Sequence, residues 1–195
     1  MSTPAATSAP VAPDVRGGLA SALPERWRLA LACALLFAPV PLLRYGVGAD
    51  GLVGVFFVAV LAVLAVKDLE ERRIPNVIVL PATAVVLAAV VALHPHHAVE
   101  ALLAGLAAGA FLLLPTLFAR GAVGMGDVKL ALLLGVALGK GVAVALLLGC
   151  LAASVGGLVL IYRHGTAARK TAVPFAPFLV CGAVAAIALG VPHAF

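Results

Sequence analysis

The sequence is poor in charged residues. They make up 11% of its 195 residues, against about 25% in an ordinary soluble domain. Only 8 residues are acidic and 13 are Lys or Arg, whereas 64% belong to the apolar set. A soluble domain of this length could not keep so much apolar surface away from water. The composition therefore excludes a soluble globular enzyme and a disordered protein, and it predicts an integral membrane protein.

Cysteines and clusters of basic residues are also scarce. The 3 cysteines occur singly within apolar blocks, so neither a zinc site nor a disulfide framework is indicated. The basic residues are scattered between apolar blocks, and the net charge of +5 therefore does not indicate a nucleic-acid partner. His94, His96 and His97 share one loop, but without a nearby acid we interpret it as a polar loop. We expect no metal and no cofactor.

What the sequence has in abundance is apolar blocks. A helix that crosses a bilayer needs about 20 apolar residues, and strands of a membrane barrel would be shorter and would alternate with polar residues. The blocks lie at 27–43, 51–67, 74–93, 98–118, 128–138, 141–162 and 174–191. Residues 1–26, rich in Ala, Pro, Ser and Thr, are expected to form a disordered cytoplasmic tail. The predicted fold is an all-α bundle of about seven transmembrane helices within a membrane domain at 27–195.

The stretch 128–162 could be one long helix or two helices. Its single charge, Lys140, lies between Gly139 and Gly141, and this break favours two helices. With seven spans and a cytoplasmic N-terminus, Arg44 and Lys140 are the only Lys or Arg residues outside, as the positive-inside rule favours. We therefore expect seven spans with the C-terminus outside.

The eight acids separate into two groups. Six are explained as charges of the tail, of a short loop or of outer helix ends: Asp14, Glu25, Glu70, Glu71, Asp50 and Glu100. The other two, Asp68 and Asp127, lie at the cytoplasmic ends of two different spans, where side chains that face the bundle are functional candidates. The alternative is a charge that sets topology or, for Asp127, an anion that favours the first turn of a helix.

Two carboxyl groups at one depth have a specific chemistry. When they are held close together they cannot both ionise easily. One can then act as a general base on water while the other donates a proton, as in aspartic proteases, without metal or cofactor. A proton-coupled transporter is the alternative, but transporters usually place acids near the midplane and often contain inverted repeats, and neither feature is evident here.

Three segments then resemble a known family. Residues 68–76, DLEERRIPN, resemble the segment of type IV prepilin peptidases in which five residues separate an Asp from IPN. Residues 124–130, GMGDVKL, are similar to their GxGD motif, and residues 173–179, VPFAPFL, to their PFGPFL segment, with Ala176 in place of the usual Gly. The segments occur in the order that the family has.

The resemblance implies an intramembrane aspartyl endopeptidase with Asp68 and Asp127 as its catalytic pair. Such enzymes remove the basic leader from prepilin-like precursors, including those of tight-adherence pili, at the cytoplasmic face of the inner membrane. The family core has six spans, here about 51–191, so that 27–43 would be an added helix. The remaining motif residues would support the site: Pro75, Asn76, Gly124, Gly126, Lys129, Pro174, Phe175 and Pro177.

The resemblance leaves some roles open. Long-form relatives carry an N-terminal methyltransferase domain with paired cysteines, and this sequence looks like the short form, so we expect no methylation. Pro75 is expected to start a span, and Asn76 either caps that helix or hydrogen-bonds near the site. Lys129 either extends to the lipid headgroups or holds an acidic group of the substrate. A non-catalytic pilus-assembly component is a further alternative. The substrate's identity and the oligomeric state are open.

Overall fold

The described part of the chain is helical throughout. The computed structural model describes residues 32–118, 124–164 and 174–195. An apolar helical segment, Ala32–Tyr45, ends with α2 (Pro39–Tyr45). It is followed by α3 (Ala49–Glu71), α4 (Asn76–Leu93), α5 (Ala98–Phe118), α6 (Met125–Leu138), α7 (Val142–His164) and α8 (Ala176–Ala188), with short 3-10 helices η1 (Pro95–His97) and η2 (Gly139–Gly141). The predicted all-α class is confirmed, whereas the tail predicted for 1–26 lies outside the described residues.

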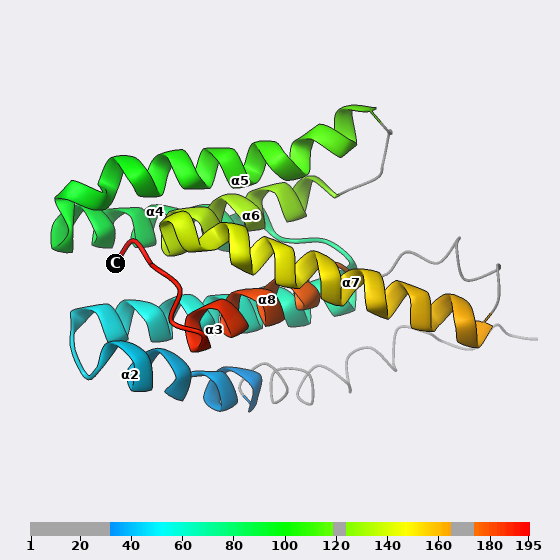
Figure 1. The fold of residues 1–195 in the computed structure, drawn as a ribbon, viewed down its shortest axis with the longest axis horizontal. Coiled ribbons are helices and arrows are strands. Elements are labelled where there is room, and N and C mark those ends of the chain that lie inside the picture. Colours follow the sequence, from blue (N-terminus) through cyan, green and yellow to red (C-terminus); the bar gives the residue numbers. More distant parts are fainter. Residues whose placement is uncertain (1–31, 119–123, 165–173) are drawn as a thin grey trace, which may run out of the picture.

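The helices form an antiparallel bundle. Consecutive helices from α2 to α8 alternate in direction, so that their ends gather at two opposite faces (Figure 1). Four described segments are long and apolar enough to cross a membrane: Ala49–Glu71, Asn76–Leu93, Pro95–Phe118 and Met125–Arg163. Ala32–Tyr45 and Ala176–Ala188 are shorter apolar helices. The architecture is that of an integral membrane helical bundle, as the composition predicts.

The last of the four long segments is two helices, as the Gly-Lys-Gly break predicts. A straight helix of 39 residues would be about 58 Å long, roughly twice the thickness of the hydrocarbon core. Instead α6 ends at Leu138, η2 follows, and α7 runs back beside the bundle (Figure 1). Gly139 makes this reversal with a φ of 52°, a conformation that favours glycine.

α6 lies in the centre of the bundle and packs against α4 and α5. Its last six residues, 133–138, are all buried. Glycines allow the close approach: a Cβ on Gly135 would lie 2.5 Å from the Ala104 carbonyl oxygen, and one on Gly105 would lie 2.7 Å from Val136 Cγ2. The small residues of these helices therefore serve packing.

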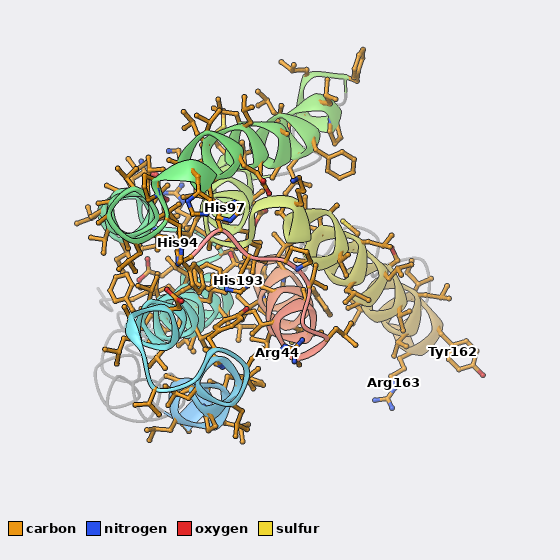
Figure 2. All side chains as sticks on the ribbon, turned by 60° about the vertical axis from the view of Figure 1, so that its left-hand side comes forward. Arg44, His94, His97, Tyr162, Arg163 and His193 are labelled. Atoms are coloured by element: carbon orange, nitrogen blue, oxygen red, sulfur yellow. The ribbon has the colours of Figure 1, made fainter. Side chains whose placement is uncertain are left out.

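The two ends of the bundle carry different polar groups. Figure 2 shows Arg44, His94, His97 and His193 gathered at one end, together with the loops that precede α3 and α5. There His94 Nε2 lies 3.0 Å from Asp50 Oδ1, and His97 Nδ1 lies 3.8 Å from Glu100 Oε2.

The expectation that the histidine loop has no nearby acid is therefore wrong, because the carboxylates come from the first turns of α3 and α5. Within the described ranges, no group of three or more His, Cys, Asp or Glu side chains is arranged to hold a metal ion.

Candidate active site

Asp68 lies in the last turn of α3 and is buried, with 6% of its surface exposed. The backbone N–H of Ala176 donates a hydrogen bond of 3.1 Å to its Oδ2 atom. The helix ends just after this acid, because Arg72 adopts a left-handed conformation with a φ of 51°. The chain then turns directly into the segment that starts α4.

Asp127 lies in the first turn of α6. Gly124 is the N-cap of that helix, so Asp127 lies in its first turn and is not the N-cap itself. A Cβ on Gly126 would lie 2.8 Å from Ile74 Cβ, and one on Gly124 would lie 3.2 Å from Asp127 Oδ2. Gly126 is therefore needed for the close approach to Ile74, whereas the contact at Gly124 is with the movable end of a side chain.

The structure brings Asp68 and Asp127 to one cavity of about 350 Å³, although they lie on different helices. The two carboxyl groups are close enough for their charges to interact. The other lining residues are Arg72, Arg73, Ile74, Asn76, Gly124, Met125, Gly126 and Lys129. The cavity lies at the end of the bundle opposite the histidines.

Lys129 and Asn76 meet beside this cavity. Lys129 Nζ donates a hydrogen bond of 2.7 Å to Asn76 Oδ1. Pro75, expected from the sequence to start this span, is the N-cap of α4, and the helix itself starts one residue later at Asn76. Of the two roles considered for Asn76, the structure therefore supports a hydrogen bond near the site.

The described part of the third motif does not line the cavity, and it contacts Asp68 through a backbone hydrogen bond. Phe175 is the N-cap of α8 and packs against the hydrophobic core, while Pro177 lies in the first turn. Pro174 precedes them directly. These residues place the buried backbone N–H of Ala176 on the Asp68 carboxyl group.

Four lining residues are not among the predicted site residues, namely Arg72, Arg73, Ile74 and Met125. From the sequence alone, the two arginines are interpreted as charges that determine topology. They line the cavity because α3 ends at Arg72 and the chain folds back over the site. A signal was available, since both lie inside the 68–76 segment between the acid and the IPN residues.

The arrangement can carry out acid–base chemistry on water. It combines a buried carboxyl group that accepts a backbone hydrogen bond with a second carboxyl group across a polar cavity. Such a pair can remove a proton from water and return one to a leaving group.

Comparison with known proteins identifies the family to which the chain belongs. A model described as the type IV leader peptidase family matches residues 55–161, a range that includes both aspartates. The chain is 34% identical over 166 residues to a prepilin leader peptidase/N-methyltransferase of Bacillus subtilis (strain 168), and this covers 82% of the chain and 64% of that relative. The chain thus spans less than two thirds of the relative's length. No solved structure gives a significant match. The chain belongs to the type IV leader peptidase family.

Proposed function

We propose that this protein is an intramembrane aspartic endopeptidase that removes the leader peptide from prepilin-like precursors. The family and the printed name of the bacterial relative support the substrate class. The observation that carries the aspartic mechanism is the shared cavity of Asp68 and Asp127. A transporter would more usually place such acids near the midplane, whereas both lie at helix ends.

In the proposed reaction the ionised aspartate takes a proton from a water molecule, whose oxygen attacks the scissile carbonyl carbon. The protonated aspartate stabilises the oxygen of the resulting tetrahedral intermediate. A proton then passes to the leaving amine as the C–N bond breaks. The two side chains need no metal or cofactor for these steps.

The distribution of basic residues supports a cytoplasmic active site. Arg72, Arg73 and Lys129 line the cavity, whereas Arg44 and Lys140 lie at the opposite end. Cytoplasmic ends of membrane helices carry an excess of Lys and Arg. We therefore place the cavity at the cytoplasmic face of the inner membrane, with the N-terminus on the same side and residues 27–195 as the membrane domain.

The test is leader removal by the purified protein in lipid nanodiscs, with a prepilin of a type IV or tight-adherence pilus as substrate. Asp68→Asn and Asp127→Asn each keep the size of the side chain but cannot act as an acid or a base. We expect each to lower kcat by at least about 10³-fold, since two groups that act as a unit are lost together.

Asp50→Asn is the matched control, because Asp50 lies on the same helix as Asp68 but at the histidine end. It should cleave like the wild type. Wild-type rates in both of the Asp68 and Asp127 variants would contradict the aspartic mechanism. Proton uptake by vesicles without any cleavage would support the transporter instead.

A further inference from the structure

The bond between Lys129 and Asn76 joins two helix beginnings that are far apart in the sequence. Asn76 is the first residue of α4, and Lys129 lies two residues after Asp127 in α6. The N···O distance of 2.7 Å is that of a charge-assisted hydrogen bond. The bond therefore ties the start of the helix that carries Asp127 to α4.

A packing contact joins the same two segments on the other side of Asp127. Gly126, the preceding residue, lies so close to Ile74 that a Cβ would meet Ile74 Cβ at 2.8 Å. Asp127 is thus flanked by a steric contact and by a hydrogen bond, both to residues 74–76. Both contacts join the first turns of α6 to the residues that begin α4.

Lys129 forms its hydrogen bond with α4 and not with the acid. Two residues on a helix point about 200° apart, so Lys129 can reach α4 while Asp127 faces another direction. The bond between Lys129 and Asn76 therefore affects Asp127 through the position of the helix that carries both residues.

We propose that Lys129 and Asn76 form a clamp that holds the Asp127 carboxyl group opposite Asp68. Both are positioning residues, and the inference rests on the proposed function of the two aspartates. The clamp complements the contact on the other acid, because Asp68 is held by burial and by the Ala176 N–H. Each member of the pair thus has its own support from a helix beginning, Asp68 from α8 and Asp127 from α4.

The clamp and a direct contact with the substrate predict different kinetics. If Lys129 bound an acidic group of the substrate, its loss would raise KM. If it positions Asp127, its loss lowers kcat with little change in KM, because misplacement by about 1 Å costs about 10²-fold in rate.

The experiment compares Lys129→Met, Asn76→Ala and the double variant in nanodiscs with the same prepilin. We expect each single variant to lower kcat by about 10²-fold at an unchanged KM, and the double variant to be no slower than either, since both remove one bond. Asn76→Asp keeps an acceptor oxygen and should retain most of the wild-type kcat. Arg163→Met removes an exposed cation at the far end of α7 and is the control for lost charge (Figure 2).

Three results would overturn the clamp: a raised KM with normal kcat, losses that add in the double variant, or normal kcat in both single variants. Thermal unfolding of every variant is measured in parallel. If Asn76→Asp also loses activity, and the activity of all variants falls in step with their thermal stability, the clamp is overturned as well. The proposed function fails separately, when Asp68→Asn and Asp127→Asn cleave normally. Inactive aspartate variants beside normal clamp variants would overturn the clamp alone.

Discussion

At the residue scale, the glycines that precede Asp127 are explained by space. Among the described glycines, positive φ values occur at Gly46, Gly139 and Gly190, but not at Gly124 or Gly126. Any residue could adopt the backbone of the motif, yet a side chain at Gly126 would meet Ile74. A contact of 2.8 Å between two Cβ atoms cannot be relieved by rotating a side chain, so the backbone itself would have to move.

Gly126→Ala should therefore displace Asp127. We expect cleavage to fall by about 10²-fold and the free energy of unfolding to drop by about 1–3 kcal/mol, as for other overpacked sites. Leader-cleavage kinetics and thermal unfolding in detergent measure the two effects. Gly157→Ala is the matched control, because no atom lies within 4 Å of its added Cβ. Wild-type kinetics in Gly126→Ala would show that this contact does not matter.

The same scale shows where sequence reasoning is strong and where it fails. Asp68 and Asp127 could be singled out because few acids remain once tail, loop and outer ends are explained. The role of Arg72 could not, because it depends on one left-handed residue at the end of α3. Apolar periodicity does not encode such a backbone turn, and the sequence therefore indicated only that the two arginines determine topology.

At the element scale, α6 is the helix whose surroundings were hardest to predict. Its 14 residues span about 21 Å, and its second half is buried on all sides. A helix that is apolar all round has no polar face to show which neighbour it contacts. Its length and its end at the Gly-Lys-Gly turn were predictable, whereas its packing against α4 and α5 required the structure.

The α5–α6 contact predicts a sharp difference between two glycines. Gly135→Ala would place a Cβ 2.5 Å from the Ala104 carbonyl oxygen and from Gly105 Cα. These are backbone atoms, so the two helices must separate, and we expect unfolding to become easier by about 1–3 kcal/mol. Gly109→Ala lies in the same interface but makes ordinary contacts at 3.6 Å or more, and it should be tolerated. Equal unfolding temperatures for the two variants would contradict this account.

At the scale of the whole molecule, the two ends of the bundle have different tasks. One end carries the cavity, and the other is closed by the residues that follow α8. The chain turns at Gly190, the Ala194 N–H donates to the Ala137 carbonyl at 3.1 Å, and Phe195 is buried with 2% exposed. His193 stacks against the Tyr45 ring at a centroid distance of 4.1 Å.

This closure predicts how stability depends on pH. Burial lowers the pKa of His193 below its usual 6.5, helped by the nearby His94, His97 and Arg44, while Asp50 opposes the shift. The unfolded chain therefore binds the proton at a higher pH than the folded protein does. The contribution of the neutral, buried His193 to stability is therefore complete above pH 6.5, and it is lost as the pH falls below 6.5 toward the lowered pKa of the folded protein.

Unfolding temperatures between pH 8 and pH 5 measure this effect. His193→Phe keeps an aromatic ring beside Tyr45 and removes the proton-binding group, so its unfolding temperature should fall less on acidification than that of the wild type. His94 and His97 are present in both proteins. Parallel curves for the two proteins would contradict a role of His193.

The sequence alone determined the class and the helical blocks, and it singled out Asp68 and Asp127 among the acids. It could do so because these depend on local properties, namely composition, the length of apolar runs and the scarcity of charge. The tertiary structure decided which side chains meet: Asp68 and Asp127 at one cavity, Lys129 and Asn76, and Asp50 and His94. These side-chain contacts depend on the distances between the helices and on how each helix is rotated about its axis. Packing around glycines such as Gly126 and Gly135 sets both quantities.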